Sequence, residues 1–312
     1  MRKCLFCYNE IDDNSIYHSK CSKTFFGTET PPLLDYRLDD IAELARDILV
    51  RSVSVTGVQP KISLDLEKKT ETHTSKFTII GLWGNYILKP PTESYPHICE
   101  LEDLTMHIAR ILGIKTALHG MVPLASGEYA YLTKRFDRVK GRKLALEDMA
   151  QLTGVLTERK YSGSLEKVGK AILQYSSMPG NDIINFIEIL IFSFITGNSD
   201  MHLKNFSLLT NEKREVLLSP AYDLLPVKLL LPGDKEETAL SMNGKKAKLS
   251  KKDFYNLGKY LGLSDLVISN IFQKFAKKMS EIISFVDYGF IPQQLIKDYR
   301  DLIQERAGRL DL

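Results

Sequence analysis

A long apolar run that ends in a dense polar segment constrains the fold of this chain more than any other feature. Residues 183–196 read IINFIEILIFSFIT, and the polar segment NSDMHLKN, residues 198–205, follows almost at once. The run contains Asn185 and Glu188 and is too short to span a bilayer, so it predicts a buried helix of a globular protein. A polar loop anchored on such a helix is held rigidly, as side chains that must keep fixed positions require.

The size and charge of the chain suit an enzyme and argue against a protein that coats nucleic acid. The 312 residues include 42 Lys and Arg against 39 Asp and Glu, a net charge of +3. This balance, with no helix pattern that carries a basic face, gives no reason to expect direct DNA binding. The N-terminus MRKCLFCYNEID has no apolar leader. We therefore expect a cytoplasmic protein without membrane contact.

The hydrophobic pattern changes along the chain from mixed to mostly helical. Helical spacing over 39–52 and 99–112 is interleaved with β-branched and aromatic segments that predict an antiparallel sheet, at 52–66, 76–81, 84–90, 117–126 and 129–138. Beyond residue 140, periodic apolar positions predict helices over 147–158, 164–175, 181–196, 251–261, 265–280 and 293–309. The predicted fold class is α+β and bilobal. An N-terminal segment, 1–35, precedes a small β-rich N-lobe, 36–134, and a larger α-helical C-lobe, 135–312.

Three of the four cysteines lie within the first 21 residues. Cys4 and Cys7 form a C-x2-C pair, and His18 and Cys21 form an H-x2-C pair ten residues later. Two intervening residues let both members of a pair face one ion, so the set can form a closed, structural zinc site. The alternative is a reduced, metal-free segment in which the cysteines only pack.

The polar segment after the apolar run has the spacing of a phosphoryl-transfer loop. Asp200 and Asn205 form D-x-x-x-x-N, in which a kinase aspartate accepts the proton of an attacking hydroxyl and the asparagine binds magnesium. Downstream, FSLLT and EVLLS predict two strands joined by the turn NEKR, a hairpin that would bring Asp223 back beside Asn205. A carboxylate there would bridge metal and nucleotide phosphates. The alternatives are a polar loop that closes a buried helix and a turn or helix-cap aspartate.

Upstream residues follow the order in which a kinase places its phosphate-binding groups. Lys89 ends the predicted strand NYILKP, and Glu102 lies thirteen residues later on the predicted helix, with Glu100 as a competing partner for the lysine. The earlier segment SVSVTGVQPK contains Ser54, Thr56 and Gly57, which could contact phosphate. It has one glycine where G-x-G-x-x-G has three. The alternatives are a solvated lysine and an ordinary strand hairpin.

Together these segments resemble the HipA family of bacterial serine/threonine kinase toxins. The similar segments are SVTGVQPK, ILKP, TKRFDR, LEDMAQ, NSDMHLKNFSLL and SPAYDLLP, which span residues 54–226. The resemblance implies a protein-kinase-like, HipA-like fold that uses ATP and Mg²⁺. The implied roles are Asp200 as catalytic base, Asn205 and Asp223 as magnesium ligands, Lys89 on the phosphates, His202, Lys134, Phe136, Asp137 and Gln151 near the nucleotide, and Ser54 or Thr56 as the autophosphorylation site.

The resemblance also implies partners. Because the SVTGVQPK segment begins near residue 54, the chain is more similar to the short HipT form, whose missing N-terminal domain is supplied by a small HipS-like protein beside a helix-turn-helix, HipB-like antitoxin. DNA would be contacted only through that antitoxin, and an aminoacyl-tRNA synthetase is the implied substrate class. The alternatives are an inactive nucleotide-binding or antitoxin-binding module and a small-molecule kinase.

Overall fold

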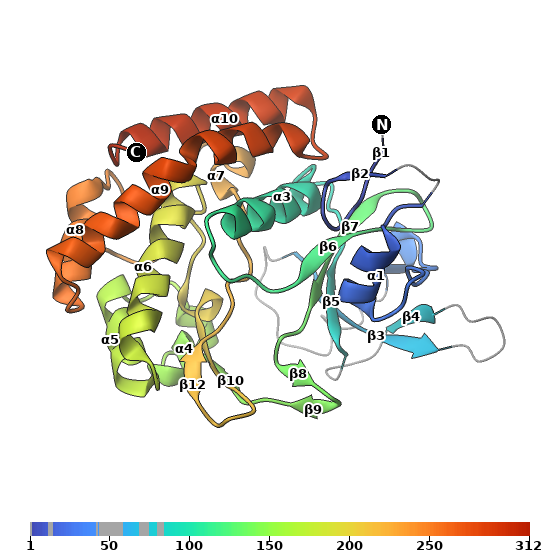
Figure 1. Cartoon of the computed structure of the whole chain (residues 1–312), viewed down its shortest axis with the longest axis horizontal. Helices are drawn as coiled ribbons and strands as arrows, with labels where there is room; N and C mark the ends of the chain where they lie inside the picture. The colour runs from blue at the N-terminus through green and yellow to red at the C-terminus, as the bar shows by residue number, and fades with distance from the viewer. Residues whose placement is uncertain (1, 12–14, 42, 44–58, 69–74, 80–83) are drawn as a thin grey trace. The chain divides into compact units, whose positions relative to one another are not determined.

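The computed structural model describes residues 2–11, 15–41, 43, 59–68, 75–79 and 84–312, and the chain divides into two compact units (Figure 1). The first unit comprises Met1–Asp103 and Ala117–Phe136, and the second comprises Leu104–Thr116 and Asp137–Leu312. The division falls within helix α3, Ile98–Ile111. The domain boundaries expected at residues 35 and 134 stay predictions.

The first unit is built on a five-stranded antiparallel sheet, as the sequence predicts. The strand order is β4-β3-β5-β7-β6. Residues alternate between the two faces of a strand, and Ile62, Leu64, Tyr86 and Leu88 accordingly place their side chains in the core at every second position. The strands are β3 Ile62–Lys68, β4 Ser75–Ile79, β5 Tyr86–Lys89, β6 His119–Pro123 and β7 Tyr129–Lys134.

The N-terminal segment packs on this sheet through aromatic rings. It contains the short pair β1 Arg2–Lys3 and β2 Glu10–Ile11, and helix α1 Ser19–Phe26, which lies beside the sheet in Figure 1. The Phe25 ring meets Tyr86 of β5 edge-on with centroids 5.9 Å apart, and Phe26 meets Phe77 of β4 at 5.8 Å. Edge-to-face pairs of this kind add to the stability gained by burying the rings.

The second unit contains the predicted β-hairpin and most of the helices. Strands β11 Ser207–Thr210 and β12 Val216–Leu218 pair antiparallel with Leu208 opposite Leu218, which confirms the hairpin, and β10 Leu146–Asp148 adds a third strand. The remaining elements are β8 Arg138–Val139, β9 Arg142–Lys143, α4 Met149–Leu152, η1 Thr157–Arg159, α5 Leu165–Tyr175, α6 Pro179–Ile195, η2 Leu203–Asn205, α7 Val227–Leu230, α8 Lys251–Tyr260, α9 Asp265–Phe285, η3 Val286–Tyr288 and α10 Gln293–Gly308.

Helix α6 is the central element of the second unit. Every residue from Phe186 to Ile195 is buried, as expected for a helix that is apolar on all sides and surrounded by neighbours. At its N-terminal end, the buried Asp182 accepts hydrogen bonds from the Ser176 hydroxyl at 2.6 Å and from the Leu218 amide at 2.7 Å. The hairpin is thereby fixed to the helix that carries the polar loop at its other end.

The structure confirms neither of two helices predicted from periodicity over its full range. The helix predicted over 147–158 is wrong in extent, because residues 147 and 148 belong to β10 and α4 ends at Leu152. Gly154 then takes a left-handed conformation, φ +66°, which interrupts the helical path. The helix predicted over 39–52 lies mostly outside the described residues.

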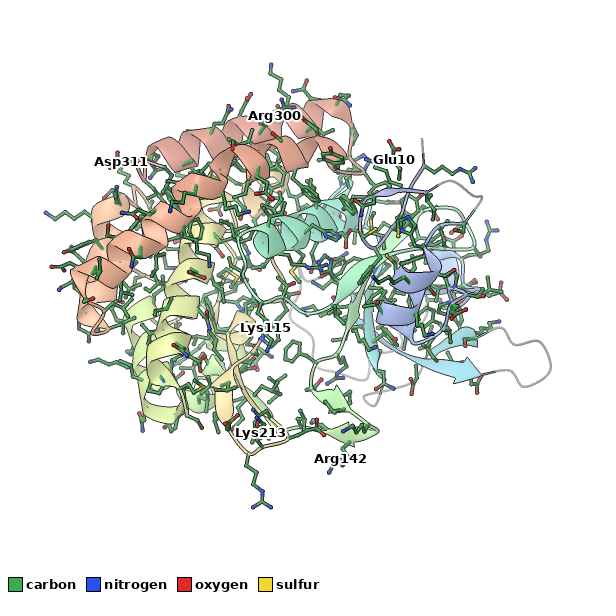
Figure 2. The ribbon with its side chains drawn as sticks, in the orientation of Figure 1. Glu10, Lys115, Arg142, Lys213, Arg300 and Asp311 are labelled. Carbon is green, nitrogen blue, oxygen red and sulfur yellow. The ribbon has the colours of Figure 1, made fainter. Side chains whose placement is uncertain are left out.

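Charged side chains line the outer side of the helices. Figure 2 shows Arg300 on α10, where it pairs with Asp287, and Asp311 at the C-terminal end of the chain. Of the helices that the structure describes, none combines the length and the apolar character needed to cross a membrane.

Candidate active site

A buried lysine–glutamate pair lies at the end of β5. The Lys89 ammonium is 2.6 Å from Oε1 of Glu102, and the two residues are 7% and 1% exposed. The ammonium also lies 5.4 Å from the centre of the Tyr131 ring, on the neighbouring strand β7. A charge withdrawn from water this far requires a partner, so each member of the pair fixes the position of the other.

The structure distinguishes between the two glutamates proposed as partners of the lysine. Residues two apart on a helix point to different faces, so Glu100 and Glu102 cannot both face β5. Glu102 contacts Lys89, whereas Glu100 lies 3.6 Å from His97, and burial raises the pKa of the Glu100 carboxyl. Of the two, Glu102 is therefore the residue that orients Lys89.

The remaining candidates of the first unit belong to the segment before β3 and to the segment around the end of β7. Of these, Ser54, Thr56 and Gly57 lie outside the described residues. The Gln59 side chain, just beyond them, donates to the Pro90 carbonyl at 2.7 Å and so links the segment before β3 to the residue after Lys89. Lys134 donates to the Phe25 carbonyl at 3.0 Å, and burial lowers the pKa of this lysine. Phe136 is half-buried.

In the second unit, a glycine turns the chain from α6 into the polar loop. Gly197 has φ +72°, a left-handed conformation, and accepts a hydrogen bond from the Lys228 amide at 3.0 Å. A Cβ at this position would lie 2.7 Å from the Leu302 side chain and 2.9 Å from Lys228. Both the backbone conformation and the close packing therefore require glycine where the loop begins.

The loop that follows is closed by hydrogen bonds to Asp200. The Asp200 carbonyl accepts from the His202 amide at 2.8 Å and from Nδ2 of Asn205 at 3.0 Å. The Asp200 amide in turn donates to Oδ1 of Asn198 at 3.2 Å. These bonds span the whole D-x-x-x-x-N segment, so the two residues singled out by their spacing form one rigid unit.

Asn198 extends this network to the end of the hairpin. Its Nδ2 donates to the Asp223 carbonyl at 3.4 Å, so one amide side chain bonds to the backbone of both the predicted base, Asp200, and the predicted magnesium ligand, Asp223. Asp223 has φ +56°, which is uncommon for a residue with a side chain and is found where surrounding structure imposes it. Next to it, the Tyr222 hydroxyl donates to the Lys204 carbonyl at 2.8 Å. The structure thus links the backbones of Asp200 and Asp223 through the Asn198 side chain, and bonds the Asn205 side chain to Asp200.

The network includes oxygen atoms of the kind that magnesium prefers. The NH₂ group of Asn205 is occupied by the Asp200 carbonyl, which leaves its oxygen, Oδ1, as the atom for a cation. The Asp223 carboxylate offers a second oxygen, and Mg²⁺ prefers oxygen ligands from one or two side chains, completed by water and phosphate.

Sequence reasoning missed Tyr161, which contacts the predicted catalytic base. Its hydroxyl donates to Oδ1 of Asp200 at 2.9 Å, and its ring meets the His202 ring edge-on with centroids 5.2 Å apart. Burial and the negative charge of Asp200 raise the pKa of Tyr161, so the hydroxyl stays a donor at physiological pH. The two residues are 39 positions apart, and no pattern in the sequence connects them.

The remaining candidates have structural partners of their own. Gln151 is exposed and completes a reciprocal cap with Asp148, in which both hydrogen bonds measure 2.9 Å. Asp137 is 3% exposed and pairs with Arg138 at 2.5 Å, and His202 is 6% exposed. Their contribution to nucleotide binding stays a prediction.

Sequence comparison assigns the chain to a known family. The family model described as "HipA-like C-terminal domain" matches residues 53–283, well over half of the chain, and the chain belongs to that family. A protein of Haemophilus influenzae named "Putative kinase" is 28% identical over 84% of this chain and 83% of its own length. "Putative kinase Y4dM" of Sinorhizobium fredii is 35% identical over 69% of this chain and 55% of its own length.

A further relative carries a more specific name. The "Serine/threonine-protein kinase toxin HipA" of Shewanella oneidensis is 29% identical over 56% of this chain, which matches 43% of its length. A solved structure of Shewanella oneidensis HipA with HipB and operator DNA superposes with a TM-score of 0.68 at 19% identity, covering 88% of this chain and 72% of that one. The α+β, HipA-like fold is thereby confirmed, and the chain spans about half the length of two of these relatives.

Proposed function

We propose that this chain is a protein serine/threonine kinase that transfers the γ-phosphoryl group of ATP. The observation that carries the proposal is the loop in which Asn205 closes on Asp200 while Asn198 joins Asp200 to Asp223. A base and two oxygen ligands held in one rigid network are what phosphoryl transfer requires, because its catalysis consists mainly of positioning and charge stabilisation.

In the proposed reaction, the Asp200 carboxylate accepts the proton of a serine or threonine hydroxyl. The hydroxyl oxygen forms a bond to the γ-phosphorus as the bond from that phosphorus to the β,γ-bridging oxygen breaks. The products are a phosphorylated protein and ADP. Lys89, oriented by Glu102, serves the same reaction by binding the nucleotide phosphates. Tyr161 holds the carboxylate of Asp200 in one orientation.

Asn205 and Asp223 are the proposed magnesium ligands. Magnesium bound there would neutralise charge on the β- and γ-phosphates. The protein holds the backbone of Asp223 and the side chain of Asn205 in one hydrogen-bond network, which would position both ligands. His202, Lys134, Phe136, Asp137 and Gln151 remain candidates for contacts to the rest of the nucleotide.

The proposal extends to a toxin of a toxin–antitoxin system. Its support is the name of the Shewanella relative and the solved HipA structure, in which HipA is bound to HipB and operator DNA. By that analogy, a HipB-like antitoxin binds this chain and DNA is reached through the antitoxin. The resemblance to the short HipT form adds a small HipS-like protein as a second partner. The proposed substrate class is an aminoacyl-tRNA synthetase, and Ser54 or Thr56 is the proposed autophosphorylation site.

Phosphate mapping on a panel of substrates tests this proposal. The purified chain is incubated with ATP, Mg²⁺ and each of the aminoacyl-tRNA synthetases of one bacterium, and phosphopeptides are mapped by mass spectrometry. A phosphoserine or phosphothreonine on one synthetase, absent with Asp200→Asn, supports the proposal. Phosphorylation of Ser54 or Thr56 alone supports kinase activity but not the proposed substrate class. ATP turnover only with an added small-molecule acceptor would replace the proposal with a small-molecule kinase.

A further inference from the structure

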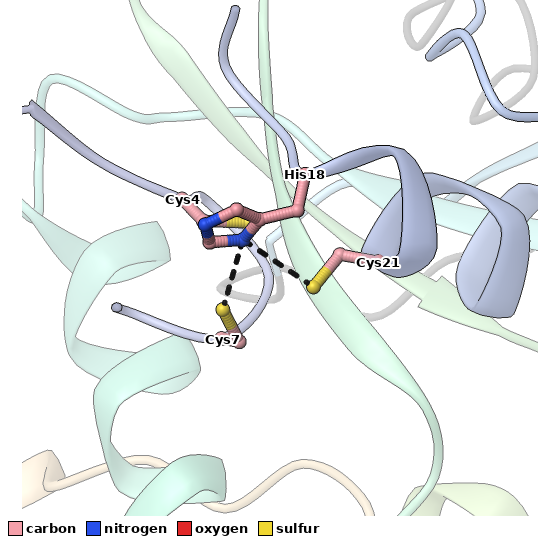
Figure 3. A group of neighbouring side chains, drawn as sticks. All are labelled: Cys4, Cys7, His18 and Cys21. Atoms are coloured by element: carbon pink, nitrogen blue, oxygen red, sulfur yellow. Dashed lines mark hydrogen bonds between the residues drawn. The ribbon is translucent and has the colours of Figure 1, made fainter. Parts of the chain in front are cut away.

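The two cysteine pairs of the N-terminal segment converge on one point. Cys4 and Cys7 lie in the loop between β1 and β2, His18 precedes α1, and Cys21 lies in its first turn. Figure 3 shows the four side chains turned toward one another, and their sulfur atoms and one ring nitrogen all lie within 4.8 Å of each other. The three cysteines are free thiols, and Cys4 is fully buried.

The spacing of the donor atoms fits a single tetrahedral ion. A tetrahedral zinc with Zn–S bonds of about 2.3 Å and a Zn–N bond of about 2.05 Å places nitrogen and sulfur ligands about 3.6 Å apart. Nδ1 of His18 lies 3.4 Å from the Cys7 sulfur and 3.7 Å from the Cys21 sulfur (Figure 3). Thiol hydrogen bonds explain these two short distances less well, because the single lone pair of Nδ1 would have to accept from two S–H groups at once.

A hydrogen bond next to the cluster leaves the His18 ring nitrogen that faces the sulfurs able to bind a metal. Nε2 of His18 lies 2.9 Å from the carbonyl of Glu10, a residue labelled in Figure 2, so Nε2 carries the proton and the lone pair of Nδ1 faces the sulfurs. This second hydrogen bond is typical of metal-bound histidine.

We propose that Cys4, Cys7, His18 and Cys21 bind one zinc ion in a closed structural site. Three thiolates and one imidazole in tetrahedral arrangement are a donor set that favours zinc. Four protein ligands leave no position for a substrate, so the ion stabilises structure and takes no part in a reaction. The site lies outside the segment that the family model covers and does not depend on the proposed kinase activity.

The residues between the ligands show what the zinc would hold in place. The Leu5 carbonyl accepts from the Met121 amide of β6 at 3.2 Å, and the Tyr17 hydroxyl donates to the Met121 carbonyl. The Tyr8 hydroxyl donates to Oδ2 of Asp103 at 2.8 Å. Asp103 follows Glu102 on α3, so the proposed zinc site supports the first turns of the helix that orients Lys89.

Metal analysis of the full chain tests the proposal. Protein purified without chelators is expected to contain one zinc per chain by elemental mass spectrometry. Cys7→Ser and His18→Ala are expected to lose most of it, whereas His18→Cys retains zinc because four cysteines form an equally good site. The matched control is Cys99→Ser, which removes the cysteine outside the cluster and keeps the metal. Zinc absent from the wild type, or unchanged in Cys7→Ser, overturns the proposal.

A second measurement uses only the wild type and so tests the metal site even if the variants fail to fold. Wild-type protein stripped of metal under reducing conditions is titrated with Co²⁺, which reports tetrahedral thiolate coordination through its visible absorption. One equivalent of cobalt that develops this spectrum, and loses it when zinc is added, supports the site. Iron or copper at one per chain in place of zinc, or a cobalt spectrum without thiolate bands, overturns it.

Discussion

The ammonium of Lys89 lies 2.6 Å from the carboxylate of Glu102, and both groups are almost completely withdrawn from water. The Coulomb attraction of such a pair roughly offsets the cost of dehydrating two ions, so the pair adds little net stability over apolar residues of the same size. Its value lies in fixing where the lysine can be. This is the property that a phosphate-binding lysine needs.

Breaking the pair from one side is expected to destabilise the protein more than removing it altogether. Glu102→Gln removes the carboxylate charge 2.6 Å from the buried Lys89 ammonium and should lower the free energy of unfolding by about 3–5 kcal/mol. The double variant Lys89→Met, Glu102→Met should recover most of that loss, because two apolar side chains of similar volume replace both ions. Urea unfolding of both variants and the wild type measures this. A double variant no more stable than Glu102→Gln would contradict the interpretation.

Tyr161 is expected to affect catalysis and not stability. Tyr161→Phe removes the hydroxyl that donates to Asp200 but keeps the ring against His202. We expect kcat for phosphoryl transfer to fall about tenfold, equivalent to about 1.4 kcal/mol in the transition state. The melting temperature should hardly change, because the residue is 46% exposed. The control is Tyr175→Phe on α5, a tyrosine of similar exposure. Equal rates for both variants would show that the Tyr161 hydroxyl does not position the base.

Tyr8 is expected to stabilise the first unit through a hydrogen bond that involves none of the proposed zinc ligands. Its fully buried hydroxyl donates to the Asp103 carboxylate, which also contacts His119 at 2.7 Å. Tyr8→Phe leaves that carboxylate one donor short and should cost about 1–3 kcal/mol of unfolding free energy. The zinc content should be unchanged, because Tyr8 is not a ligand. Tyr260→Phe, an exposed site on α8, serves as the control, and equal unfolding curves for the two variants would refute the expectation.

Acid should weaken the second unit through Glu237. Burial opposes ionisation of this carboxyl, but hydrogen bonds from Arg309 and the Leu249 amide, and the charge of Arg306, outweigh it and lower its pKa. A carboxyl whose pKa is lower in the folded state contributes stability that is complete above the unfolded value, about 4.5, and is lost as the pH falls through the folded value.

The variant Glu237→Gln should therefore be less stable than the wild type at neutral pH, and the difference should shrink in acid. Unfolding free energies measured from neutral pH to below pH 4.5 test this. Glu236→Gln, at the exposed neighbouring position, is the control. A difference between wild type and Glu237→Gln that stays constant or widens toward acid would contradict the sign of the effect.

Local patterns in the sequence predicted much of the fold. The apolar period of α6, the alternating strands β3 and β5, and the turn between β11 and β12 each depend on neighbouring residues and appear as expected. The meeting of Lys89 with Glu102 also follows from local order, since a strand and the next helix are joined by a short connection. Only the structure shows that Glu102, and not Glu100, faces Lys89, because the spacing of the residues does not tell which face of the helix points toward the strand.

Contacts between distant segments could not be predicted. Tyr161 reaches Asp200 across 39 positions, and Tyr8 reaches Asp103 across 95, and in neither case does composition indicate a partner. The helix predicted over 147–158 failed for a related reason, since pairing of β10 with β11 outweighed a helical pattern at its start. The convergence of the two cysteine pairs was predictable because each pair carries its own geometric rule.

The most direct test of the central claim is intact-mass spectrometry of the wild type and Asp200→Asn after incubation with ATP and Mg²⁺. Both proteins start free of phosphate, and ATP binding is measured for each by calorimetry. We expect that both bind ATP and that only the wild type gains the mass of one or more phosphates. Equal phosphate gain in Asp200→Asn would show that Asp200 is not the base. If neither protein gains phosphate mass, although both bind ATP and the panel of acceptors has been tested, the result would contradict the proposed kinase activity.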